Sequence, residues 1–154
     1  MSKEIIASDL SRTISNANLY FFGILTSMIH MAWVRTVCGR LKSDFRYSNT
    51  IVYNNFPWPE NPTEKQKQAI EDKAQKVLDV RAQFPDSSLA DLYDPLTMPP
   101  ALVKAHNDLD KAVDLAYRSQ PFTSEANRME FLFGLYEKYT ADLFTVEGKK
   151  GKRR

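Results

Sequence analysis

Three stretches in the second half of the chain repeat apolar residues at intervals of three and four, and this spacing most restricts the possible fold. The first stretch follows Thr63-Glu-Lys-Gln66, a capping box in which the threonine side chain accepts from the backbone N–H three residues on and the glutamine reaches back. We therefore expect a helix to begin at Glu64 and to end near Phe84, because the ring of Pro85 prevents its continuation. Its apolar face is formed by Ala69, Ile70, Ala74, Val77 and Leu78.

The other two stretches are helical by the same criterion. Pro99 and Pro100 suit the first turn of one helix, Ser124 suits the cap of the last, and Ser87 or Ser88 can cap a short turn through Leu92. The apolar faces comprise Leu102, Ala105, Leu109, Ala112, Val113 and Ala116 in one helix, and Met129, Leu132, Phe133, Tyr136 and Tyr139 in the other. Amphipathic helices must bury these faces against one another, so we predict a mainly α fold built around a small helical bundle.

The first half of the chain is mixed. Residues 17–37 are apolar on nearly all sides, which indicates an enclosed helix, and Gly39 is placed to end it. Residues 48–56 alternate and are rich in β-branched and aromatic side chains, which predicts a strand that stops at Pro57 and Pro59. We expect a short α+β segment in residues 1–60, a helical bundle in residues 61–144 and a flexible basic tail in residues 145–154.

The composition is that of a folded protein with one domain, or one domain plus part of another: 154 residues, 43% apolar and 26% charged. Cys38 is the single cysteine, and with no secretory signal in the sequence this favours a cytoplasmic location. The most apolar run, Leu19 to Val34, includes His30 and other polar residues and falls short of the roughly 18 apolar residues that a spanning helix needs. No membrane partner is expected.

Positive charge is concentrated at the two ends of the chain. Lys and Arg outnumber Asp and Glu by 6 to 4 in residues 1–60 and by 5 to 1 in residues 145–154, whereas residues 61–144 have 10 against 14. These ends would attract a polyanion.

The segment from Arg40 to Pro59 combines cations, amides, aromatic rings and prolines. Arginine and lysine contact phosphates, and short hydroxyl and amide side chains bond to phosphates or base edges. We therefore expect double-stranded DNA as a partner, contacted by Arg40, Lys42, Arg46, Tyr47, Ser48 and Asn49. The alternative is that the aromatic residues pack an ordinary strand and the cations only keep its edge soluble.

We expect no catalytic, metal-binding or cofactor-binding residues in this chain. His106, Asp108, Asp110 and Asp114 form its only His/Asp cluster, and on one helix these side chains cannot converge on an ion without another element. The 5 glycines are never spaced as in a phosphate-binding loop.

Five runs of the sequence are together typical of one protein family. They are Leu19 to Trp33, Gly39 to Ser48, Val52 to Pro59, Tyr93 to Leu102 and Ala105 to Val113. On these runs the chain resembles the C-terminal end of MmeI-like enzymes, which are large single-chain type II restriction-modification proteins that include an adenine-specific DNA methyltransferase.

The resemblance implies that residues 1–60 close a target-recognition domain and that residues 61–144 form a C-terminal helical domain. It also implies that S-adenosylmethionine is the cofactor of the complete enzyme, bound by methyltransferase regions that this chain lacks and with which it acts. We expect the chain itself to be a non-catalytic recognition and supporting part. The alternative is a helical protein–protein interaction module, and a metal hydrolase built on the His106 helix conflicts with the geometry above.

Overall fold

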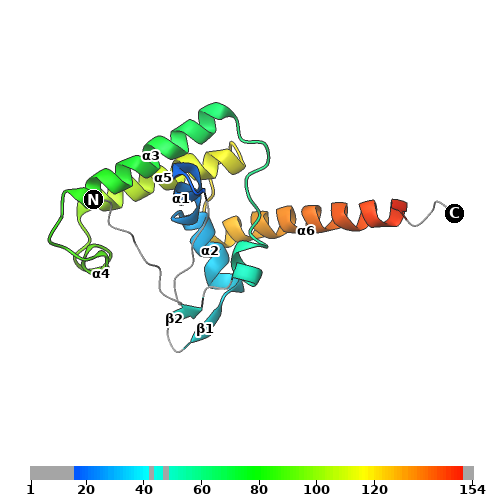
Figure 1. Cartoon of the computed structure of the whole chain (residues 1–154), viewed down its shortest axis with the longest axis horizontal. Helices are drawn as coiled ribbons and strands as arrows, with labels where there is room; N and C mark the ends of the chain where they lie inside the picture. Colours follow the sequence, from blue (N-terminus) through cyan, green and yellow to red (C-terminus); the bar gives the residue numbers. More distant parts are fainter. Residues whose placement is uncertain (1–15, 42–43, 47–48, 151–154) are drawn as a thin grey trace.

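The structure is a computed structural model that describes residues 16–41, 44–46 and 49–150, with side-chain positions for residues 16–38 and 50–142. In chain order the elements are the helices α1 (Leu19–Leu25) and α2 (Met28–Val37), the strands β1 (Gly39–Leu41) and β2 (Asp44–Arg46), the π-helical turn η1 (Asn49–Tyr53), and the helices α3 (Glu64–Ala82), α4 (Leu89–Leu92), α5 (Pro100–Tyr117) and α6 (Glu125–Lys150). The predicted mainly α fold is confirmed (Figure 1).

Helices α3 and α5 lie side by side, and α1 packs against them (Figure 1). Helices α3 and α5 run in opposite directions. This is shown by Gln66 near the start of α3, which donates to the carbonyl of Leu115 near the end of α5 at 2.8 Å. Gly23 permits the close approach of α1, since a Cβ at this position would lie 2.6 Å from Ile70 Cγ2 and 3.3 Å from Leu109 Cδ1. The three helices share one core, which includes Ile24, Ile70, Ala74, Val77, Leu102, Leu109 and Val113.

The predicted helix starts of the second half are confirmed. Thr63 Oγ1 accepts from the backbone N–H of Gln66 at 3.2 Å, and Gln66 Oε1 accepts from that of Thr63 at 2.9 Å. Ser88 and Asp91 make the same reciprocal pair at the start of α4. Ser124 Oγ accepts a backbone N–H at 3.1 Å at the start of α6. These local signals set the bundle's helix boundaries.

Residues 17–37 form two helices, so the prediction of one continuous helix was wrong. The break falls at Thr26 and Ser27, whose hydroxyls donate to the carbonyls of Phe22 at 2.8 Å and Ile24 at 2.6 Å. Such bonds to the preceding turn compete with continued helix. Apolar spacing alone does not register them.

Residues 49–53 form the turn η1, so the strand predicted for residues 48–56 was also wrong. Val52 and Phe56 are 0% and 3% exposed, whereas Ile51 is 55% exposed. Asn54, midway between Val52 and Phe56, is exposed, whereas a strand would place all three residues on one face. The side-chain amide of Asn55 donates to the carbonyls of Thr50 at 2.7 Å and Ile51 at 3.1 Å, which stabilises the turn.

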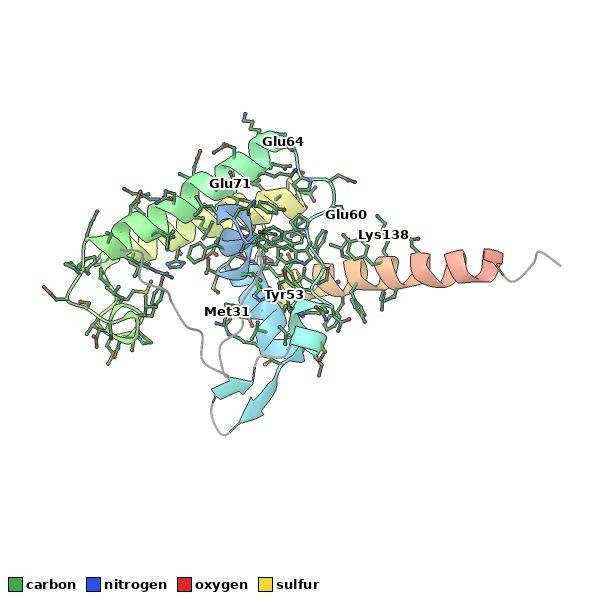
Figure 2. All side chains as sticks on the ribbon, in the orientation of Figure 1. Met31, Tyr53, Glu60, Glu64, Glu71 and Lys138 are labelled. Carbon is green, nitrogen blue, oxygen red and sulfur yellow. The ribbon has the colours of Figure 1, made fainter. Side chains whose placement is uncertain are left out.

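The proline-rich connector of residues 57–62 is held by the two last long helices. Tyr117 of α5 donates to the carbonyl of Pro57 at 2.8 Å, and Tyr139 of α6 donates to the carbonyl of Trp58 at 3.0 Å. Lys138 lies beside Glu60 in Figure 2, with 2.9 Å between Nζ and Oε1. The connector is therefore packed into the fold on both sides.

Helix α6 packs its first turns against α2 and then extends away from the rest of the molecule (Figure 1). The ring of Trp33 in α2 lies 5.8 Å from that of Phe133 and 6.0 Å from that of Tyr136. In the described ranges no helix has the length and apolar character needed to cross a membrane.

Candidate nucleic-acid interface

Strands β1 and β2 form a short antiparallel ribbon that contains both arginines expected to contact DNA. Arg40 is paired with Phe45, and Arg46 is paired with Gly39, in adjacent pairs of the ribbon. The register therefore places the two arginines on neighbouring strands but in successive pairs, which take opposite faces of a ribbon. Asn49 begins η1 soon afterwards. The other three predicted contact residues, Lys42, Tyr47 and Ser48, lie outside the described residues.

Helix α2 leads directly into the ribbon. It ends at Val37 and β1 begins at Gly39, so Cys38 alone links them. The backbone N–H of Cys38 donates to the carbonyl of Val34 at 2.9 Å and closes the last helical turn. On the buried side of α2, Trp33 is only 2% exposed. A well-packed helix thus fixes where the ribbon leaves the body.

The turn η1 holds the other end of the ribbon. Trp33 Nε1 donates to the carbonyl of the buried Val52 at 3.0 Å, which ties η1 to α2. Phe56 packs edge-on against His30 of α2, with 4.5 Å between ring centroids. Burial lowers the pKa of His30 to about 4, so its imidazole is neutral at pH 7. One end of the ribbon therefore continues from the C-terminus of α2, and the other end leads into η1, which packs on the buried face of α2.

The N-terminus of α2 is capped from α5. Ser27, its N-cap residue, makes no side-chain cap bond. Instead Asp110 Oδ1 accepts from the backbone N–H of Met28 at 2.8 Å. Burial raises the pKa of Asp110 from 3.8 to about 6, with the Asp114 carboxylate adding to the rise while the Met28 bond and Arg128 oppose it. The bundle therefore positions the start of the helix whose far end carries the ribbon.

A largely buried ion pair and a more exposed one reinforce this frame. Arg128 of α6 donates to Asp114 of α5 at 2.6 Å, and their side chains are 16% and 14% exposed. Arg35 of α2 donates to Glu125 of α6 at 2.7 Å, with side chains 37% and 43% exposed. The first pair joins the last two long helices, whereas the second contributes less because it is open to solvent.

The residues of the predicted His/Asp cluster have separate partners. His106 Nε2 lies 2.6 Å from the hydroxyl of Tyr93, which also accepts from Arg81 Nε at 2.8 Å. Burial, assisted by the charge of Arg81, lowers the pKa of His106. Asp108 pairs with Lys104, one turn earlier, at 2.6 Å. Asp110 caps α2, and Asp114 pairs with Arg128. Among the residues whose placement is known, no group of three His, Cys, Asp or Glu side chains could hold a metal ion.

The sequence indicates the cations of the ribbon but not the residues that hold it. Trp33, Val52 and Asp110 make the contacts that attach the ribbon to the bundle. Asp110 offered one signal, because it follows Leu109 on the apolar side of its helix, where a carboxylate needs a partner. Nothing in the local sequence around Val52 indicates a tryptophan partner.

Comparison with known proteins identifies two family matches along the chain. Residues 1–60 match the family model of the MmeI target recognition domain, and residues 62–144 match that of the MmeI C-terminal domain. The chain is 44% identical over 137 residues to DNA methyltransferase A of Bacillus subtilis (strain 168), and this match covers 89% of the chain and 15% of that protein.

A solved structure gives the same relationship. The chain is similar to the type IIL restriction-modification enzyme MmeI, solved in complex with DNA, with 49% identity and a TM-score of 0.78. The match covers 82% of this chain and 17% of that enzyme chain. The chain thus spans only a small part of the length of either relative.

Proposed function

The chain belongs to the MmeI family, and from this premise we propose that it forms the end of a DNA target-recognition domain together with the helical domain that supports it. The observation that supports this most directly is the β1–β2 ribbon. It contains Arg40 and Arg46, it continues from the end of α2 on one side, and on the other side it leads into η1, which is bonded to Trp33 of α2. A ribbon on a rigid support can present cations to a duplex at little entropic cost.

Within this proposal the six residues have two roles. Arg40, Lys42 and Arg46 contact phosphates, which position the chain on the duplex without reading its sequence. Tyr47, Ser48 and Asn49 supply hydroxyl and amide groups for backbone or base-edge contacts. The DNA in the related MmeI structure supports DNA as the ligand.

The proposal places this chain inside a longer enzyme. That enzyme transfers a methyl group from S-adenosylmethionine to adenine in double-stranded DNA as part of a restriction-modification system. Methyl transfer belongs to regions outside residues 1–154, and this chain contributes recognition and support. The related DNA methyltransferase A, of which the chain spans 15%, supports methyl transfer to DNA as the activity of the longer enzyme.

A duplex-binding assay across a salt series tests the proposal. Replacing Arg40, Lys42 and Arg46 together by alanine removes three phosphate contacts and should weaken binding about 10- to 100-fold. The slope of log affinity against log salt should fall by about 2 to 3, because each neutralised phosphate contributes about 0.9.

The matched control removes the same number of charges from the other side of the molecule. Replacing Lys65, Lys73 and Lys76 of α3 by alanine should leave duplex affinity within about twofold. Equal losses in both variants would show that DNA responds only to net charge. Unchanged binding in the ribbon variant would remove the ribbon from the interface.

A further inference from the structure

A groove runs along the side of the α3/α5 pair that α1 does not occupy, and we call it the α3–α5 groove. It consists of three hollows of about 220, 390 and 460 Å³. Asp108 lines the first and second hollows, and Lys111 and Leu115 line the second and third, so the hollows are contiguous. Its apolar floor includes Val80, Ala105, Ala69, Ala112, Leu115 and Phe122.

The floor carries an exposed apolar side chain at its centre. Leu115 is 53% exposed, although α5 packs Leu102, Leu109 and Val113 fully into the core. The alanines on either side, Ala69 and Ala112, leave space for a side chain from another molecule. A narrow apolar floor between two antiparallel helices is the shape that receives the apolar face of a third helix.

The rim of the α3–α5 groove is basic. Lys65, Lys73, Lys76 and Lys111 line it, and none of them takes part in the ion pairs formed among the described residues. The two acidic residues along it, Asp108 and Asp114, are already paired with a lysine and an arginine at 2.6 Å. Complementary charge would therefore be negative.

The position of the groove favours protein over the DNA of the proposed interface. The ribbon follows the end of α2 away from the α3/α5 pair (Figure 1), whereas the described residues that line the three hollows of the groove include none from α1 or α2. A duplex on the ribbon would not run along this floor. The apolar residues of the floor would also favour contact with apolar side chains of a protein over contact with charged phosphates.

We propose that the α3–α5 groove receives an acidic amphipathic helix from the part of the enzyme outside residues 1–154. This inference rests on the proposed function, because it assumes the longer enzyme chain. The apolar stripe of that helix covers Leu115 and its neighbouring alanines, and its Asp and Glu residues face the four lysines of the rim. The helix thereby fastens the recognition part to the rest of the enzyme.

A labelled synthetic peptide tests the chemistry of the groove on this chain. The probe is a helix of about 18 residues with a leucine stripe flanked by glutamates, which at 1.5 Å per residue spans about 27 Å. Fluorescence anisotropy should show saturable binding, and Lys73→Glu with Lys111→Glu should weaken it at least about tenfold. The same double variant should gain affinity for a peptide whose glutamates are replaced by lysines.

The controls separate this inference from the proposed function. Lys138→Glu changes an exposed lysine on α6, outside the groove, and should alter peptide affinity less than about twofold. The groove variant (Lys73→Glu with Lys111→Glu) should keep its duplex affinity. The ribbon variant (Arg40, Lys42 and Arg46 replaced by alanine) should keep its peptide affinity. Circular dichroism and thermal unfolding confirm that each variant is folded. The inference would be overturned if the groove variant bound the peptide as tightly as the wild type does. It would also be overturned if the groove variant lost duplex binding and kept peptide binding.

Carbodiimide cross-linking of the longer enzyme tests the source of the helix. This reagent joins lysines directly to carboxylates in contact. Cross-links from Lys73 or Lys111 to Asp or Glu residues outside residues 1–154 are expected, and they should disappear in the groove variant. Cross-links confined to residues 1–154 would contradict the assignment even if the peptide binds.

Discussion

Replacing Asp110 by asparagine and by alanine separates the hydrogen bond that caps α2 from the charge that α5 buries. The carboxylate accepts from the N–H of Met28 at 2.8 Å, and its pKa is raised from 3.8 to about 6, chiefly by burial. A raised carboxyl pKa means that the folded state holds the proton more tightly than the unfolded state. The stabilisation from this group is therefore complete below pH 3.8 and is lost as the pH rises through 6.

The magnitude follows from the size of that difference. A pKa difference of about two corresponds to about 3 kcal/mol in the free energy of unfolding. Because Asp110 is only partly buried, solvent screening should reduce the effect to about 1 to 2 kcal/mol. Asp110→Asn keeps an oxygen acceptor without the charge, so it should be more stable than the wild type by this amount above pH 6 and equal to it near pH 4. Asp110→Ala also loses the cap and should be less stable than Asp110→Asn by about 1 kcal/mol at every pH.

Urea unfolding of the three proteins, followed by circular dichroism from pH 4 to pH 7.5, measures these differences. Parallel pH profiles for the wild type and Asp110→Asn would show that Asp110 does not titrate in this range. Equal stability of the asparagine and alanine variants would show that the cap contributes nothing. Since α2 carries the ribbon, Asp110→Ala should also weaken duplex binding several-fold at pH 7.5, whereas Asp110→Asn should retain it.

Gly23→Ala, with Gly134→Ala as its control, and Trp33→Phe test the packing that supports the ribbon. Gly23→Ala places a Cβ 2.6 Å from Ile70 Cγ2 and should lower the melting temperature, with a cost of about 1 to 3 kcal/mol, whereas Gly134→Ala, with no atom within 4 Å of the added Cβ, should raise it. Trp33→Phe removes the indole N–H that donates to the carbonyl of Val52 at 3.0 Å, so it should cost about 1 to 2 kcal/mol in denaturant unfolding and weaken duplex binding. Unfolding at the wild-type midpoint in either case would contradict the packing described here.

The helices of the second half could be predicted because their signals are local. Thr63 with Gln66, Ser88 with Asp91, and Ser124 lie within one turn of the groups that they cap. The family could also be identified from the sequence, and the family matches confirm it.

The first half could not be predicted in the same way because, besides the local bonds of Thr26, Ser27 and Asn55, its structure depends on distant partners. The second helix of residues 17–37 begins at a cap supplied by Asp110, 82 residues later in the chain. The turn η1 forms where Trp33 and Asn55 bind its carbonyls, so a pattern of β-branched residues gave the wrong element. For the candidate site, the sequence indicates which residues carry charge, whereas the support beneath them arises only in three dimensions. The roles of Arg40, Lys42, Arg46, Tyr47, Ser48 and Asn49 stay predictions.

The attachment of the connector has a consequence for exchanging specificity between relatives. Tyr117 of α5 and Tyr139 of α6 donate to the carbonyls of Pro57 and Trp58. The connector between the two family matches is therefore hydrogen-bonded to helices that follow it in the chain. In a chimera joined at residues 57–62, the connector and the two tyrosines would come from different proteins, and these hydrogen bonds could be lost. An exchange between relatives should instead replace the β1–β2 ribbon alone, or transfer residues 16–142 together.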